Sequence, residues 1–142
     1  MIFESEPQDF NPVCEVVSCF VECDGKILML HRQDHKPQGN TWAGPAGKVD
    51  EEESINEAIL REVLEETGIF LIWPKHFKKL FVRFPEYDFV YHIFHEKLDE
   101  AAEISINEKE HKDFLWIEPR KALDLPLMLD EDLCIKMFYN LK

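Results

Sequence analysis

The sequence predicts an α/β protein with a single domain, residues 1–142, and three observations support this prediction. Segments rich in β-branched and aromatic residues alternate with polar turns along most of the chain, which is typical of strands. Residues 54–67 instead repeat their apolar side chains at the three- and four-residue spacing of a helix. The length suits one domain, and no repeat, linker or low-complexity segment divides it. Helices interleaved with strands favour the α/β class.

The net charge is strongly acidic and limits the possible partners. The chain has 29 acidic against 16 basic residues, a formal charge of −13, while 45% of its residues are hydrophobic. Such a field repels nucleic acid and anionic membranes, so neither is an expected partner. The same field repels a nucleotide. An anionic small molecule would therefore need metal ions or a few local cations to bind.

The ends and the cysteines predict a cytoplasmic protein. Residues 1–11 are polar, lack the pattern of a signal peptide and are expected at the periphery. No apolar run approaches the roughly 18 residues of a membrane span. The four cysteines form no Cys-x-x-Cys pair, so we expect reduced thiols, with zinc or a disulfide as the alternative. They are Cys14, Cys19, Cys23 and Cys134.

The N-terminal third predicts a hairpin followed by a loop. Two segments rich in β-branched and aromatic residues, 12–23 and 26–32, are expected to be strands. Asp24 and Gly25 between them form a hairpin turn signal. Segment 33–40 is polar, carries Pro and Gly, and predicts a loop.

The central helix has a clear beginning and end. Ser54 with Glu57 three residues later matches a capping box, and Gly68 suits the left-handed position that ends a helix. One side of the helix is apolar and is expected to pack on a sheet. That side consists of Ile55, Ile59, Leu60, Val63 and Leu64.

The C-terminal half predicts further strands and two helices. Its strand-like apolar segments are separated by polar turns. They are residues 69–73, 76–84, 88–97, 104–106 and 114–117. One or two helical turns are expected at 119–125, and a final helix at 130–141.

Three glutamates on the central helix predict a cation site. Each helical residue advances about 100° around the axis, so Glu62, Glu65 and Glu66 share an arc of roughly 100°. Like charges so close repel one another, which a helix avoids unless something positive lies among them. Several carboxylate oxygens converging on one point suit a hard divalent cation such as Mg²⁺. A solvated acidic surface is the alternative.

Residues 47–69 resemble the box that defines the Nudix hydrolases. That box reads Gly, five residues, Glu, seven residues, Arg-Glu-apolar-any-Glu-Glu-any-Gly-apolar, and no defined position departs from it here. The matching residues are Gly47, Glu53, Arg61, Glu62, Val63, Glu65, Glu66, Gly68 and Ile69. The resemblance implies a mixed β-sheet between helices, an α/β/α sandwich. The MutT-like members are the nearest in pattern.

The resemblance also implies roles for the box residues. Glu62 would be the general base or a metal-bridging residue, and Glu65 and Glu66 would be ligands of Mg²⁺, or of Mn²⁺. Which glutamate is the base varies in the family, so Glu65 stays a catalytic candidate. Arg61 is expected to orient the carboxylates more than to touch substrate. The carbonyl of Ala46, before the first box glycine, would be a further metal ligand.

Residues outside the box complete the expected site. Glu110 stands six residues before Trp116, where some MutT-like enzymes have an extra acidic ligand, and Glu108 is its competitor. Arg32 lies fifteen residues before Gly47, an offset at which an arginine of MutT-like enzymes contacts the phosphates, and a surface ion pair is the alternative. Arginine suits this role because its fork pairs with phosphate oxygens. Lys48 is the second phosphate candidate.

The pocket for the base is predicted only loosely. Several aromatic residues are candidates to stack on a base, although each could equally belong to the core. They are Trp42, Phe81, Phe84, Tyr87 and Phe89. The pair Asp130 and Glu131 could read the edge of a base, as a similar acidic pair does in enzymes that destroy oxidised purine triphosphates, or could cap the final helix. The six histidines form no metal-spaced cluster and are expected to be structural or on the surface.

Taken with the resemblance, these residues imply hydrolysis of a small-molecule nucleotide. The expected reaction cleaves a phosphoanhydride of a nucleoside diphosphate linked to a further group. A (deoxy)nucleoside triphosphate or its oxidised form, giving monophosphate and pyrophosphate, is the first candidate. Hydrolysis of ADP-ribose, of a nucleotide sugar or of a dinucleoside polyphosphate is the alternative. A non-catalytic nucleotide sensor is the alternative from another class.

Overall fold

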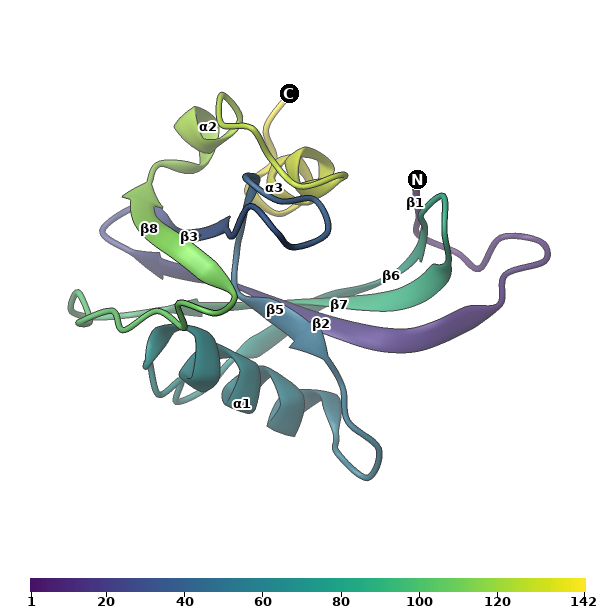
Figure 1. Ribbon diagram of the computed structural model, residues 1–142, viewed down its shortest axis with the longest axis horizontal. Coiled ribbons are helices and arrows are strands. Elements are labelled where there is room, and N and C mark those ends of the chain that lie inside the picture. The colour runs from purple at the N-terminus through teal and green to yellow at the C-terminus, as the bar shows by residue number, and fades with distance from the viewer.

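In the computed structural model, which describes residues 1–142, a twisted sheet separates one long helix from two shorter ones (Figure 1). The helices are α1 (Ile55–Thr67), α2 (Pro119–Ala122) and α3 (Glu131–Tyr139). The strands are β1 (Ile2–Phe3), β2 (Pro12–Cys23), β3 (Lys26–Arg32), β4 (Trp42–Ala43), β5 (Ala46–Lys48), β6 (Lys75–Arg83), β7 (Asp88–Lys97) and β8 (His111–Ile117). Helix α1 covers one face of the sheet, while α2 and α3 lie over the other. The predicted α/β/α sandwich is confirmed.

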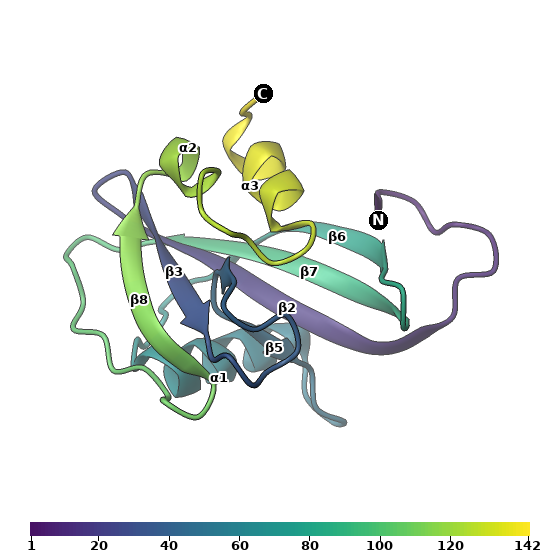
Figure 2. The ribbon, with the colours of Figure 1, turned by 45° about the horizontal axis from the view of Figure 1, so that its top comes forward.

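The sheet is mixed, as expected. Its strands follow the order β1-β6-β7-β2-β3-β4, with β5 added to β2 and β8 added to β3. The long central pair β2–β7 is parallel, whereas β2–β3, β6–β7 and β3–β8 are antiparallel. Figure 2 shows β8 running beside β3, on the side away from β7. Because β3 pairs with only the last two residues of β2, the middle of β2 is free to pair with β5 and so positions the start of the box.

Both caps of α1 form as predicted. The Ser54 side chain accepts from the Glu57 N–H, and the Glu57 carboxylate accepts from the Ser54 N–H. Gly68 ends the helix with φ 79° and donates its N–H to the Leu64 carbonyl at 2.9 Å. The packing face differs in part from the prediction, because Leu60 and Leu64 remain exposed. The residues facing the sheet are Ala58, Ile59, Val63, Glu66 and Thr67.

Segment 69–73 is not a strand, although it was expected to be one. Ile69 and Leu71 are buried while Phe70 is exposed, an alternation that resembles a strand pattern. The N–H groups of residues 72 and 73 bind the buried carboxylate of Glu96, at 2.6–3.1 Å, instead of a neighbouring strand. A side chain therefore satisfies this backbone, and the segment stays irregular.

Other differences lie at the ends of elements. Residues 104–106 form no strand, although Ile104 and Ile106 pack against the core. Strand β8 begins three residues earlier than predicted. Residues 2–3, expected at the periphery, add a short strand to β6. Helices α2 and α3 are shorter than predicted, and no helix is long and apolar enough to cross a membrane.

Candidate active site

Arg61 lies at the centre of the acidic face of α1. Its Nε and Nη2 donate to the two carboxylate oxygens of Glu53, at 2.8 and 2.9 Å. Its Nη1 donates to Glu62 at 2.8 Å and to Glu65 at 3.3 Å, and Nη2 also reaches the Lys48 carbonyl at 3.0 Å. The hydrogen bonds that Glu53 accepts from Arg61, and a further one from the Asp50 N–H, lower the pKa of Glu53 to about 2. The arrangement is that of a positioning residue, because one guanidinium holds three box carboxylates.

Glu62 lies directly against the backbone of Gly47. A Cβ added at Gly47 would overlap the carboxyl group of Glu62. Strand β5 sets this approach, because Gly47 pairs with Val17 in the middle of β2. The glycine at the start of the box is therefore required by the space that the Glu62 carboxylate occupies.

Glu66 is the buried acid of the site. Its Oε1 accepts from the N–H of Ala46 at 2.9 Å. Burial raises the pKa of Glu66 well above its usual range, and the negative charges of Glu62 and Glu110 raise this pKa further. The hydrogen bond from the Ala46 N–H and the positive charge of Arg32 lower it in part. A buried carboxylate near two other acids is costly unless a cation joins them.

The donor set fits a hard divalent cation. It consists of carboxylate oxygens with backbone groups nearby, the chemistry that Mg²⁺ prefers. No three His, Cys, Asp or Glu side chains stand together at metal-binding spacing. Glu62 and Glu65 are instead paired with Arg61, at 2.8 and 3.3 Å. Ala46 donates its N–H to Glu66, and the metal-ligand role of its carbonyl stays a prediction.

The structure brings Glu110 to the box from the other end of the chain. The charge of Glu110 acts on Glu66, and Glu110 itself accepts from Lys36 Nζ at 2.9 Å. The hydrogen bond from Lys36 lowers the pKa of Glu110 despite partial burial. In the competing candidate, Glu108, the backbone carbonyl accepts a hydrogen bond from Gln33 Nε2 at 2.8 Å.

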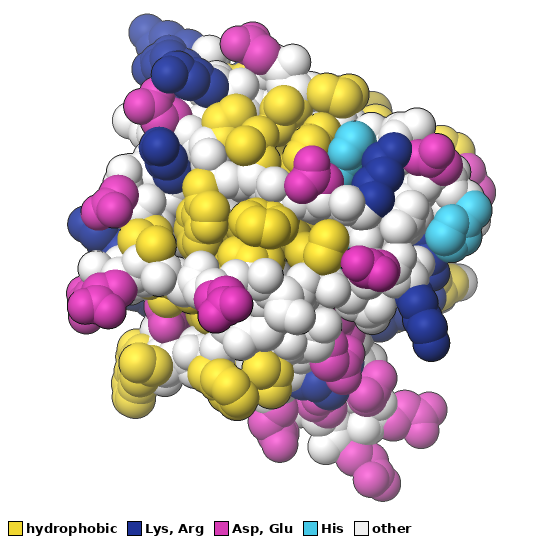
Figure 3. Space-filling view, turned by 60° about the vertical axis from the view of Figure 1, so that its left-hand side comes forward, with side chains coloured by type: hydrophobic (Ala, Val, Ile, Leu, Met, Phe, Trp, Pro, Cys, Tyr) yellow, Lys and Arg dark blue, Asp and Glu magenta, His cyan; other side chains and the backbone are white.

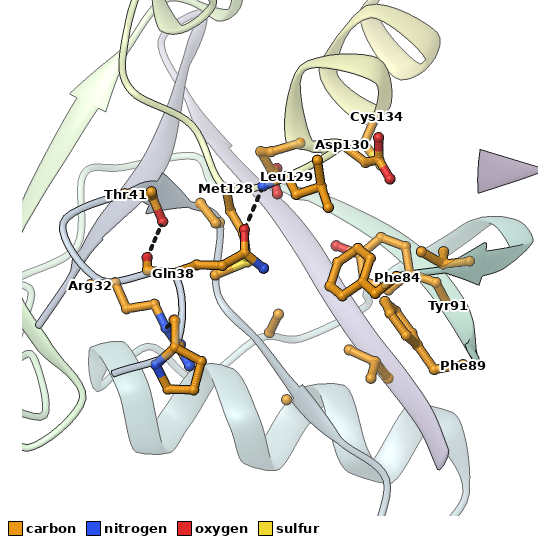
Figure 4. A pocket seen from close by; sticks show the side chains of 18 of the residues that line it. Arg32, Gln38, Thr41, Phe84, Phe89, Tyr91, Met128, Leu129, Asp130 and Cys134 are labelled. Carbon is orange, nitrogen blue, oxygen red and sulfur yellow. Dashed lines mark hydrogen bonds between the residues drawn. The ribbon is translucent and has the colours of Figure 1, made fainter. Parts of the chain in front are cut away.

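A cavity of about 340 Å³ opens beside these acids (Figure 4). Arg32 and the loop that follows β3 lie on one side, with Gln38 and Thr41 among their residues. Phe84, Phe89 and Tyr91 face them across the cavity, from β7 and the turn before it. The segment that leads into α3 closes a third side, and Ala46, Gly47, Lys48 and Glu66 form the end next to the box. The volume falls in the range of small-molecule sites.

Two cations at this cavity have no acidic partner. Arg32 donates Nε to the carbonyl of Pro37 at 2.6 Å, which fixes the side chain, and it forms no ion pair with a carboxylate. Lys48 is exposed and makes no ion pair either. In a chain of charge −13, such groups are available to an anionic ligand.

The predicted aromatic residues divide into two groups. Phe84, Tyr87 and Phe89 line the cavity, as expected for residues that could stack on a base. Trp42 does not, because its ring stacks on His31 with centroids 4.2 Å apart, and Phe81 packs edge-on against Phe10. Strand β4 turns Trp42 toward the α3 side of the sheet, a placement decided by register rather than by residue type.

Asp130 and Glu131 both line the cavity but differ in environment. Asp130 begins α3 with φ 68°, makes no side-chain cap and pairs with the N-terminal ammonium of Met1 at 2.9 Å. The predicted capping position is confirmed, because Asp130 is the N-cap residue and Glu131 lies in the first turn, but the side-chain hydrogen bond of a cap is absent. Glu131 is buried, and burial raises its pKa to about 7, although a hydrogen bond from the Gly44 N–H acts to lower it.

Sequence reasoning missed the cavity residues Tyr91 and His111. Tyr91 was not singled out, and His111 was treated as structural or surface. His111 is buried, its Nδ1 has no hydrogen-bond partner, and burial with the Arg32 charge lowers its pKa to about 4. His111 on β8 lies opposite Arg32 on β3 in the antiparallel register. Only this register, which the sequence does not give, could have identified His111 as a cavity residue.

The fold and the acid-faced helix define a Nudix-type domain, and comparison with known proteins agrees. A family model described as the NUDIX domain matches residues 14–136, and the chain belongs to this family. The CTP pyrophosphohydrolase of Escherichia coli K12 is 30% identical over 115 residues, covering 80% of this chain and 82% of that protein. The 8-oxo-dGTP diphosphatase of a Buchnera aphidicola strain is 34% identical over 94 residues, 65% of this chain and 73% of that one.

Other relatives are longer than the part that matches. The chain spans 35% of the uncharacterised Nudix hydrolase YvcI of Bacillus subtilis, 38% identical over 60 residues, which is 42% of this chain. Among solved structures, a MutT protein from Methanosarcina mazei superposes with a TM-score of 0.81 at 24% identity, covering 94% of this chain and 97% of that one. The predicted fold, the MutT-like family and its hydrolase class are thereby confirmed.

Proposed function

We propose that this protein hydrolyses a phosphoanhydride bond of a nucleoside diphosphate derivative with Mg²⁺. The first candidate substrate is a (deoxy)nucleoside triphosphate or its oxidised form. Water attacks one phosphorus, the bond to the bridging oxygen breaks, and monophosphate and pyrophosphate leave. The cytosine and oxidised-guanine nucleotides named for two relatives favour this substrate class.

The observation that carries the proposal is the meeting of buried Glu66 and unpaired Arg32 at one cavity. An acid that needs a cation lies beside a guanidinium that needs an anion. A divalent cation together with a polyphosphate satisfies both at once. Neither partner alone would do so, because the metal leaves Arg32 unpaired and the phosphate would repel Glu66.

The box residues receive separate tasks in this proposal. When bound, Mg²⁺ lowers the pKa of its water and offsets the charge on the phosphoryl oxygens. Glu65 and Glu66 would hold it with Glu110 and the Ala46 carbonyl, and Glu62 would take the proton from the attacking water. Glu62 is suited to the role of base because partial burial raises its pKa, although the hydrogen bond and charge of Arg61 act to lower it.

The remaining cavity would bind the nucleoside. Arg32 and Lys48 would bind the phosphates, which places the base toward Phe84 and Phe89. Asp130 would then contact the edge of the base, although its pairing with Met1 must loosen for this to happen. Trp42 stays a proposed ligand contact only if it leaves its stack on His31.

Two alternatives stand beside this proposal. The Nudix domain of Shewanella oneidensis NrtR, in a complex with ADP-ribose, shares the fold with a TM-score of 0.80 at 20% identity, covering 96% of this chain and 92% of that one. A bifunctional NMN adenylyltransferase/ADP-ribose pyrophosphatase from Francisella tularensis is 25% identical with a TM-score of 0.72, which makes ADP-ribose hydrolysis the second candidate activity. Sensing without catalysis is the third, and it is disfavoured because every box carboxylate is retained.

The decisive experiment is phosphate and pyrophosphate release from a nucleotide panel with Mg²⁺. The panel should contain the common and oxidised triphosphates, ADP-ribose and a dinucleoside polyphosphate. We expect turnover of at least one triphosphate and a loss of about 100-fold or more in Glu66→Gln. Full activity of Glu66→Gln would reject the site. No turnover with tight binding of one nucleotide would favour the sensor.

A further inference from the structure

Lys36 forms an ion pair with Glu110 at the edge of the box. The Nζ–Oε1 distance is 2.9 Å, and the two side chains are 27% and 37% exposed. Their backbones are fixed relative to each other, because Gln33 donates its N–H to the Glu110 carbonyl at 3.0 Å. Arg32 fixes the next turn by donating to the Pro37 carbonyl. The pair is therefore built into the loop and is not a chance contact of two mobile side chains.

This pair lies next to the cavity, although neither of its side chains lines it. The charge of Glu110 acts on Glu66, and Arg32 and Lys36 both act on Glu110. The residues next to the pair in sequence, Pro37 and His111, both line the cavity. Lys36 is thus one residue from the cavity wall, and its ammonium holds an acid assigned to the metal.

We propose that Lys36 and the divalent cation compete for Glu110, and that the Lys36 ammonium released by the metal binds the phosphates of the substrate. This inference rests on the proposed function and goes beyond it by giving Lys36 two successive partners. Lys36 holds Glu110 before the metal arrives and binds the polyphosphate afterwards. Metal binding thereby prepares the site for its anionic substrate.

Two opposite effects follow from this competition. Without substrate, Lys36 opposes metal binding, because a cation that takes Glu110 must displace the ammonium. With substrate, Lys36 supports binding, because it supplies a positive charge to the phosphates. A lysine that only braced its loop would change both affinities in the same direction.

The first test measures Mn²⁺ affinity by titration calorimetry without nucleotide. Lys36→Met should bind Mn²⁺ about two- to five-fold more tightly than the unmodified protein. This factor corresponds to the interaction energy of a partly exposed ion pair, which the metal no longer has to break. In a Glu110→Gln background the same substitution should change the affinity less than twofold. An equal gain in both backgrounds would show a general charge effect and overturn the proposal.

Lys112→Met is the matched control. Lys112 Nζ pairs with Asp34 at 2.5 Å and also contacts Asn40, so it braces the same loop from β8 without reaching the box. It removes the same charge and should leave the Mn²⁺ affinity unchanged within twofold. Equal effects of Lys112→Met and Lys36→Met would also overturn the proposal.

The second test measures binding of methylenediphosphonate, which cannot be hydrolysed, at saturating Mn²⁺. Lys36→Met should weaken this binding about five- to twenty-fold, Lys36→Arg should retain most of it, and Lys112→Met should not change it. Unchanged binding in Lys36→Met refutes the second step. Hydrolysis lost in Glu66→Gln but with no Lys36 effect contradicts this inference alone, whereas absence of any hydrolysis contradicts the proposed function.

Discussion

At the residue scale, the site depends on one close approach between backbone and side chain. Glu62 occupies the space that a Cβ of residue 47 would fill, and Arg61 holds the same carboxylate from its other side. The position of Glu62 is thus set by a glycine and by a guanidinium. Misplacing a reacting group by about 1 Å can cost on the order of 100-fold in rate.

Gly47→Ala should therefore reduce activity far more than stability. The added methyl group displaces the flexible end of Glu62, so we expect kcat to fall about 100-fold while the free energy of unfolding changes by about 1 kcal/mol or less. Rate measurements and urea unfolding check the two parts. In a Glu62→Ala background the same substitution should cost little further activity. A full additional loss there would contradict the account.

Glu131 should make stability depend on pH. Its folded-state pKa of about 7 exceeds the ordinary value of 4.5, so the folded chain binds the extra proton between these values. Stability is therefore highest at low pH and is lost as the pH rises through this window. Relative to Glu131→Gln, the unmodified protein should lose on the order of 2 kcal/mol between pH 5 and pH 8.

Urea unfolding at both pH values measures this difference. Asp124→Asn, which removes one exposed acid that does not act on Glu131, is the control and should follow the unmodified protein at both pH values. If Glu131→Gln and the unmodified protein lose stability in parallel, Glu131 does not hold its proton in the folded state.

At the scale of elements, α1 carries both the packing and the chemistry. Its caps were predictable because Ser54, Glu57 and Gly68 act within a single turn. Its packing face was less predictable. The sheet covers an arc centred on Ile59 and Val63 and leaves Leu60 at its edge, and only the position of the sheet decides this.

Gly68→Ala tests the C-terminal cap. The φ of 79° suits glycine, whereas a Cβ there would only touch the Cβ of Ser105 at 3.4 Å. The cost should thus come from the backbone and amount to about 1–2 kcal/mol. Gly68→Asn should cost about half as much, because asparagine tolerates this conformation. Equal costs in urea unfolding would indicate a steric cause instead.

At the scale of the whole molecule, acidic charge gathers around the box. Figure 3 shows acidic side chains clustered low on one face, beneath a broad group of hydrophobic side chains. With a net charge of −13, the chain repels polyphosphates except near Arg32, Lys36 and Lys48. Divalent cations are attracted to the same acidic region.

Mg²⁺ should accordingly stabilise the protein beyond the effect of ionic strength. At ten times its Kd, a ligand of the folded state adds about 1.4 kcal/mol, or roughly 3–5 °C in Tm. Tm should rise more in MgCl₂ than in NaCl of equal ionic strength. This excess should disappear in Glu66→Gln. An equal excess in that variant would place the bound cation elsewhere.

The sequence by itself determined the α/β class, the caps of α1, most strands and the acidic face of the box. These features depend on residue type and on spacing within one or two turns. Only the tertiary structure decided that Glu110 pairs with Lys36, that His111 stands beside Arg32, and that Trp42 lies away from the cavity. Each depends on strand register or on contacts between distant segments. A shift of one residue in register would turn His111 and Trp42 to the opposite face, and no local pattern encodes that register.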